Sequence, residues 1–172
     1  MTRLFSFTPL LVLTLCALMR GCSYPDDYVE FRKLPPDQQT AQFKQLPIDR
    51  QIDYYFYDQS HEPPYMGFGK LIASQGESVL PDLLRRLKAE PAEHRQNDLI
   101  WVIETMHTEF QPLDKNNEVI ETVEKVVNQM KDPAWQASSR KSLEVIRSRP
   151  GTPAPPPRIF RDPNSSPTPP GG

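Results

Sequence analysis

Apolar residues recur at helical spacing through the middle of the chain, most clearly from Gly76 to Met106. In the first half of this stretch leucines fall at i, i+3, i+4 and i+7, and apolar residues repeat that spacing in the second half. A proline-containing turn over residues 90–93 separates the two halves. The pattern predicts a hairpin of two antiparallel amphipathic helices. Its apolar positions are Leu80, Leu83, Leu84 and Leu87, then Leu99, Val102, Ile103 and Met106.

The same pattern occurs a second time when the sequence is shifted by 43 residues, so that Leu80 falls on Val123 and Ile103 on Ile146. Two helices per unit at this period resemble the HEAT and armadillo-type repeats. The resemblance implies an all-α fold, a short stack of antiparallel helical hairpins that offers surface for protein binding. A plain antiparallel helical bundle is the alternative. The matched positions of the second copy are Val123, Val126, Val127, Met130, Leu143, Val145 and Ile146.

Upstream of this hairpin the pattern predicts three further helices and a domain over residues 35–149. Pro35-Pro36-Asp37 suits the start of a short helix that ends at Pro47. The next helix begins at Ile48, and a third covers residues 66–75, where Gly76 is placed to stop it. Residues 48–75 resemble a degenerate cap of the helical array.

The helix that begins at Ile48 carries a dense aromatic cluster over residues 54–57. Tyr54 and Tyr57 lie off its main apolar face. One interpretation is a patch that binds a partner or a glycan, because aromatic side chains give large contact area at low entropic cost. The other is that this helix lies between two layers and buries both of its faces.

The first residues predict export rather than a part of the fold. Arg3 precedes an apolar run over residues 4–19 that is too short to span a bilayer. The run ends at Met19-Arg20-Gly21-Cys22, which resembles the lipobox of bacterial lipoproteins. The resemblance implies a signal peptide over residues 1–21 and a lipid anchor on Cys22, although Arg20 departs from the pattern. Ser23 after the cysteine implies the outer rather than the inner membrane. Ordinary signal-peptide cleavage, which leaves a free Cys22 thiol, is the alternative.

Two polar segments flank the predicted domain. Residues 22–34 are expected to form a short tether that holds the domain off the membrane. Residues 150–172 are rich in proline, serine and glycine, which predicts a disordered or polyproline-like tail. Within this tail the segment Arg158-Ile159-Phe160-Arg161 has two apolar residues between cations. It is a candidate docking motif for a partner, or else a tail anchor that folds back on the domain, or a segment without a function of its own.

Composition and motifs exclude several classes of function. The formal net charge of −2 argues against a nucleic-acid partner. Glu104 and His107 stand at i, i+3 on one helix, but no second such pair completes a metal site. We therefore expect no metal and no cofactor, and interpret His107 as a cation favoured by a helix C-terminus. No nucleophile elbow or phosphate loop is present, so we expect no enzyme.

The sequence thus predicts an exported cell-envelope lipoprotein whose helical domain binds another protein. Two alternatives remain: a periplasmic immunity or inhibitor protein against a toxin or hydrolase, and a peptidoglycan- or glycan-binding module that uses Tyr54 and Tyr57. The sequence does not predict the oligomeric state.

Overall fold

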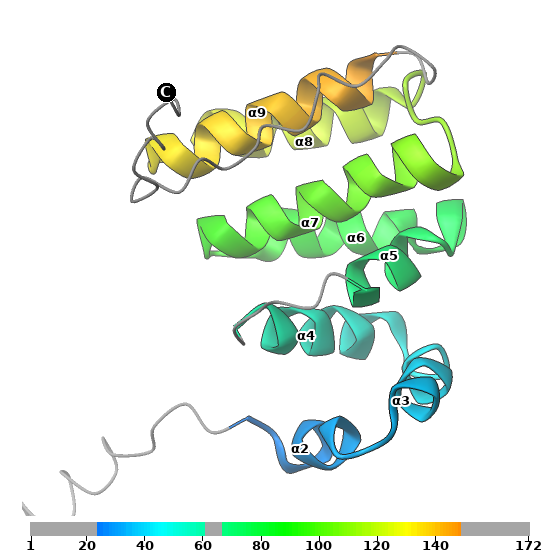
Figure 1. The fold of residues 1–172 in the computed structure, drawn as a ribbon. Helices are drawn as coiled ribbons and strands as arrows, with labels where there is room; N and C mark the ends of the chain where they lie inside the picture. The colour runs from blue at the N-terminus through cyan, green and yellow to red at the C-terminus, as the bar shows by residue number, and fades with distance from the viewer. Residues whose placement is uncertain (1–23, 61–66, 149–172) are drawn as a thin grey trace, which may run out of the picture. The chain divides into compact units, whose positions relative to one another are not determined.

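A computed structural model describes residues 24–60 and 67–148, which are all-α and contain no strand, as the sequence predicts. By its internal contacts the chain divides into two compact units, Met1–Leu71 and Ile72–Gly172, called here the N-terminal and C-terminal units. The α-helices are α2 (Asp26–Arg32), α3 (Pro36–Phe43), α4 (Ile48–Gln59), α5 (Gly67–Ala73), α6 (Leu80–Ala89), α7 (Glu93–Thr105), α8 (Asn117–Gln129) and α9 (Pro133–Arg147) (Figure 1).

In the C-terminal unit two antiparallel hairpins, α6–α7 and α8–α9, stack as successive layers (Figure 1). Helix α6 packs on α7 and α8, and helix α9 packs on α7 and α8. Helices α7 and α9 run parallel, because their first turns meet at one end and their last turns at the other. At the first turns the Glu93 carboxylate accepts hydrogen bonds from the backbone N–H groups of Lys131 and Asp132, both at 2.8 Å. The predicted all-α fold with antiparallel hairpins is therefore confirmed.

The core of the C-terminal unit is aliphatic and follows the predicted spacing. The predicted positions of the first hairpin are all buried, and so are those of the second apart from Val145, which is half-buried. Trp101 on α7 is also half-buried. Burying one such Leu, Ile or Val side chain is worth about 1.5–3 kcal/mol, so this layer carries much of the stability of the unit.

The ends of these helices follow recognisable capping chemistry. Helix α8 is capped by Asn116, whose side chain accepts a hydrogen bond from the Val119 N–H. Helix α9 begins at Pro133, directly after its N-cap Asp132, whose side chain accepts hydrogen bonds from the N–H groups of Ala134 and Trp135. Gly76 has a φ of 65°, a left-handed conformation that favours glycine. The stop predicted at Gly76 is wrong, because α5 already ends at Ala73 and Gly76 begins a short 3₁₀ helix, Gly76–Val79.

In the N-terminal unit α2 and α4 lie side by side, and α3 connects them (Figure 1). Both α3 and α4 begin directly after a proline, as the sequence indicates. The tether predicted for residues 22–34 is wrong over α2. Tyr28 and Phe31 of this helix are only 1% and 2% exposed, which makes α2 part of the folded unit.

The core of the N-terminal unit is mainly aromatic. The ring of Phe43 on α3 stacks on Phe68 of α5 with centroids 4.4 Å apart. Phe31 lies 4.9 Å from Tyr54 and 5.6 Å from Phe68. These contacts explain why α2 folds despite its charged sequence: a single turn of helix places both of its aromatic rings on the same side. The buried aromatic residues are Tyr28, Phe31, Phe43, Tyr54, Tyr55, Phe56 and Phe68.

Candidate functional site

The tyrosines predicted to bind a partner lie in a cluster between α2 and α4. Tyr54 is 3% exposed, and its ring lies 5.1 Å from that of Tyr28 in an edge-to-face contact. Tyr57 is half-buried, with its ring 5.1 Å from Tyr28 and 5.7 Å from Tyr24. The expectation of an open aromatic patch is wrong for Tyr54, because its ring is covered. The alternative, that α4 buries more than one face, is confirmed.

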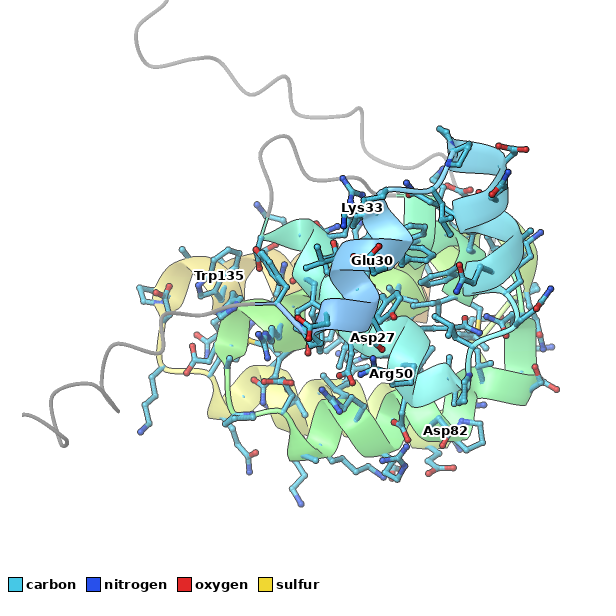
Figure 2. The ribbon with its side chains drawn as sticks, turned by 90° about the horizontal axis from the view of Figure 1, so that it is seen from below. Asp27, Glu30, Lys33, Arg50, Asp82 and Trp135 are labelled. Carbon is cyan, nitrogen blue, oxygen red and sulfur yellow. The ribbon has the colours of Figure 1, made fainter. Side chains whose placement is uncertain are left out.

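Charged groups surround this cluster. Arg50 of α4 forms an ion pair with Asp27 of α2, and Figure 2 shows the two side chains next to one another. The Tyr54 hydroxyl donates to the same carboxylate at 3.1 Å, and the Arg50 guanidinium lies 5.2 Å from the Tyr54 ring centroid. Partial desolvation raises the pKa of Asp27, but the hydrogen bonds from Arg50 and Tyr54 outweigh it, so the pKa lies below its usual value. Burial, followed by the hydrogen bond to Asp27, raises the pKa of Tyr54.

A second carboxylate of the cluster is deeply buried. Asp58 at the end of α4 is 1% exposed and forms an ion pair with Arg32 of α2. The Tyr28 hydroxyl lies 3.4 Å from the same oxygen. Burial, then the negative charge of Asp58, raise the pKa of Tyr28. The positive charge of Arg32 compensates the buried negative charge of Asp58. This ion pair therefore joins α2 to α4 and does not expose a reactive carboxylate.

His107 has a structural role that the sequence did not suggest. It lies in the π-helical turn Met106–Phe110 and is 2% exposed. Its Nδ1 accepts a hydrogen bond from the Leu113 N–H at 2.8 Å, and its Nε2 lies 3.0 Å from the Ser148 carbonyl oxygen. Because a backbone N–H only donates, Nδ1 is unprotonated and Nε2 donates to Ser148. The interpretation of His107 as a cation at a helix end is therefore wrong: the neutral ring ties the ends of α7 and α9 together.

Asp98 on α7 is a carboxyl group whose pKa is shifted toward neutral pH. It is half-buried, and burial raises its pKa to about 6, opposed by the charge of Arg95. Such a shift occurs in acid–base catalysts, but also where a carboxyl is simply packed among apolar side chains. Within residues 24–60 and 67–148, no three His, Cys, Asp or Glu side chains gather so that they could hold a metal ion.

The C-terminal unit exposes an aromatic surface at the first turns of α7 and α9. Trp135 is 39% exposed, and its ring centroid lies 6.5 Å from that of His94, which is also exposed (Figure 2). With Pro133, these residues form what we call the indole surface. Phe110, 46% exposed, lies at the other end of α7.

Sequence reasoning missed the indole surface because the helical spacing places Trp135 on the buried side of α9. Ser139, one turn further along, is fully buried, and Leu143 and Ile146 follow on the same side. Trp135 nevertheless stands in the first turn, beyond the last apolar layer between α7 and α9. Its place next to the helix cap at Asp132 was the available signal.

The remaining predicted site residues, Cys22 and Arg158-Ile159-Phe160-Arg161, lie outside the described residues. Among the helices of residues 24–60 and 67–148, none combines the length and apolar character needed to cross a lipid bilayer. Comparison of the chain with protein-family models and with curated proteins gave no match, and comparison with solved structures gave none either.

Proposed function

We propose that the protein is an exported lipoprotein of a bacterial cell envelope whose helical hairpins bind another protein through the indole surface. The proposal of protein binding rests on the exposed Trp135 ring, which lies beside His94 at the first turns of the parallel helices α7 and α9. Tryptophan is the side chain most enriched at the energetic centres of protein interfaces, because it buries a large area and loses few rotamers.

The local charges favour a protein partner over a glycan or nucleic acid. The Glu93 and Asp132 carboxylates lie beside Trp135 and are both held by backbone N–H groups at the first turns of α7 and α9. Carboxylates next to an aromatic centre suit a partner segment that carries apolar and basic side chains. The buried position of Tyr54 removes the main support for glycan binding.

The lipid anchor rests on the sequence Met19-Arg20-Gly21-Cys22 after an apolar run. A lipidated Cys22 places the helical units at a membrane surface, where a partner in the same envelope meets them at high local concentration. Intact-mass measurement of the protein from membrane fractions should show an acyl adduct on Cys22 and cleavage before it. A water-soluble chain with a free Cys22 thiol would contradict the anchor and leave the binding proposal untouched.

Site-specific photo-crosslinking in cells tests the binding proposal. A photoreactive phenylalanine analogue is placed at Trp135, and the same analogue at Phe110 serves as the matched control, because both positions are exposed aromatic residues on the C-terminal unit. We expect a discrete adduct of higher mass from position 135, and its loss when His94 is replaced by Glu. Equal adducts from positions 135 and 110, or none from 135, would overturn the proposal.

The identity of the adduct also separates a scaffold from an immunity protein. An inhibitor is one kind of protein-binding domain, and its partner would be a toxin or a hydrolase that loses activity in the complex. A structural envelope protein as the crosslinked partner would favour a scaffold.

A further inference from the structure

We propose that the indole surface binds an arginine side chain of the protein partner, which stacks on the Trp135 ring and pairs with the Asp132 carboxylate. Because this arginine belongs to the partner, the inference rests on the proposed function. The groups concerned lie at the first turns of α7 and α9, within residues 93–94 and 132–135.

The backbone N–H groups at the start of these two helices already have anionic partners. The first turns of helices carry N–H groups without a partner in the helix, and these groups attract anions. Here the Glu93 carboxylate accepts hydrogen bonds from the N–H groups of Lys131 and Asp132. One oxygen of Asp132, Oδ1, accepts from the N–H groups of Ala134 and Trp135 at 2.8 and 3.3 Å. The protein's own carboxylates therefore occupy the donors to which an anionic ligand would bind.

The second oxygen of Asp132 is available to a cation. Within residues 24–60 and 67–148 no donor lies within hydrogen-bonding distance of this oxygen, Oδ2, and the neighbouring Lys131 forms no ion pair with it. Asp132 is exposed, and its cap bond places the carboxylate against the backbone of Trp135, whose ring is 39% exposed. The surface thus combines an aromatic ring with an exposed carboxylate.

The N-terminal unit contains an arginine that is bound by such a combination. The Arg50 guanidinium lies 5.2 Å from the centroid of the Tyr54 ring and forms an ion pair with Asp27 at the same time. The indole surface has the ring and the carboxylate, but in the described part of the chain no arginine lies over Trp135. An arginine from a second protein would complete the same arrangement.

Arginine suits this surface better than lysine. A guanidinium is planar, so it can stack on the indole face and still direct N–H groups toward a carboxylate, whereas an ammonium is a point charge without a face to stack. Tryptophan is also the ring to which cations bind most strongly. The His94 ring, whose centroid lies 6.5 Å from that of Trp135, packs beside the indole and limits its rotation.

Fluorine NMR of the purified full-length protein tests this contact. Incorporation of 5-fluorotryptophan gives one signal for Trp135 and one for Trp101, the only other tryptophan, and a Trp135→Phe variant assigns them. The probes are two peptides, acetyl-Leu-Arg-Leu-amide and the same peptide with citrulline in place of arginine. Citrulline keeps the size and the planar end group of arginine but carries no charge.

We expect the arginine peptide to move the Trp135 signal until it saturates, and to bind about tenfold more tightly than the citrulline peptide, because it adds a cation–π contact and an ion pair. Equal affinities of the two peptides, or a Trp135 signal that neither peptide moves, would overturn the inference.

Asp132→Asn tests the carboxylate without removing the helix cap, because asparagine caps a helix as well as aspartate does. This variant should lose most of the preference for arginine over citrulline. Glu121→Gln is the matched control: it removes an exposed carboxylate near the start of α8, whereas the indole surface follows the end of that helix. The control should keep the preference, and a preference that survives in Asp132→Asn would overturn the pairing with Asp132.

The titration and the crosslinking experiment fail separately. A crosslinked partner together with equal peptide affinities would leave the proposed function intact and remove the arginine contact. A preference for arginine without any crosslinked partner would contradict the proposed function and not the affinity of the surface for a guanidinium. If both hold, Asp132→Asn should weaken the crosslinked adduct at position 135, and Glu121→Gln should not.

Discussion

The N-terminal and C-terminal units are both helical, yet they are built from different side chains. The core of the C-terminal unit consists of leucine, isoleucine, valine and methionine at regular helical spacing. The core of the N-terminal unit consists of tyrosine and phenylalanine from short helices. An aliphatic core needs only side chains of complementary shape that pack closely, whereas buried tyrosines also need hydrogen-bond partners for their hydroxyl groups. The N-terminal unit provides these partners as carboxylates: Asp27 for Tyr54 and Asp58 for Tyr28.

This difference changes what charge does in each unit. In the N-terminal unit the Arg32–Asp58 and Arg50–Asp27 ion pairs join α2 to α4 across the aromatic cluster. In the C-terminal unit the ion pairs that join helices, Arg147–Glu124 and Lys88–Glu118, are exposed, and two further carboxylates, those of Glu93 and Asp132, satisfy backbone N–H groups at helix ends. The N-terminal unit therefore joins its helices through a buried carboxylate, that of Asp58, whereas the ion pairs between helices of the C-terminal unit lie at its surface.

The largest expected effect is that of Phe31→Ala, which tests whether α2 belongs to the fold. Phe31 is 2% exposed and contacts Tyr54 and Phe68, so its truncation should cost about 3–5 kcal/mol in the free energy of unfolding of the N-terminal unit. Amide hydrogen exchange in α2 and α4 measures this loss.

Val29→Ala is the matched control, because Val29 lies on the same helix and is 41% exposed. Its effect should stay within about 0.5 kcal/mol. If Phe31→Ala had no larger effect than the control, residues 26–32 would be a tether after all.

Ile103→Ala makes the corresponding test in the aliphatic unit. Ile103 is fully buried on α7, and its truncation should cost about 2–5 kcal/mol, which urea unfolding followed by circular dichroism measures. Ile120→Ala on α8 removes the same atoms from a half-buried position and should cost clearly less. Equal losses at the two positions would mean that the layer between α7 and α9 is not the tightly packed part of the unit.

The sequence predicts the C-terminal unit well because an aliphatic residue that recurs every third or fourth position has one explanation, a buried helix face. Leu83, Leu87 and Ile103 are all fully buried, as their spacing requires. The failure at α2 has a physical cause. Helix α2 has four charged residues, and of its three apolar residues only Tyr28 and Phe31 are buried. The contacts of these two rings come from α4 and α5, far along the chain.

The indole surface and His107 escaped prediction for a related reason: periodicity does not show where a packed layer ends. Trp135 has the spacing of a core residue and lies one turn beyond the core. His107 has the spacing of a helix-end cation, but the chain folds back so that Leu113 and Ser148 meet both of its ring nitrogens. Both positions depend on contacts between segments that the local pattern does not encode.

Asp98→Asn is expected to stabilise the C-terminal unit, in contrast to the substitutions above. Burial raises the pKa of Asp98 to about 6, so the folded state disfavours the ionised form. The folded pKa lies above the unfolded value of about 4, so ionisation of Asp98 lowers stability as the pH rises from about 4 through 6. At pH 7 the substitution should add about 1–2 kcal/mol to the free energy of unfolding, after a discount for the remaining exposure.

The gain should vanish below about pH 4, where the carboxyl is protonated in both states. Urea unfolding at several pH values measures this dependence. Glu144→Gln removes an exposed carboxylate from α9 and serves as the control. A stability difference between Asp98→Asn and the wild type that does not change between pH 4 and 7 would show that ionisation of Asp98 is not its cause.

Tyr54→Phe has the smallest expected effect and tests the polar side of the aromatic cluster. The ring and its contacts with Tyr28 and Phe31 remain, and only the hydrogen bond to Asp27 is lost, which should cost about 0.5–1.5 kcal/mol. Because that bond and Arg50 lower the pKa of Asp27, its contribution is present above the unfolded pKa of about 4. The contribution is lost as the pH falls through the lower folded value.

A double-mutant cycle with Asp27→Ala isolates this bond. In the Asp27→Ala background the cost of Tyr54→Phe should fall, since the hydroxyl has lost the acceptor that it shares with Arg50. Hydrogen exchange in α4 measures the four free energies. An unchanged cost in that background would mean that the Tyr54 hydroxyl stabilises the unit through a contact other than Asp27, and that this carboxylate is not the partner that the buried tyrosine needs.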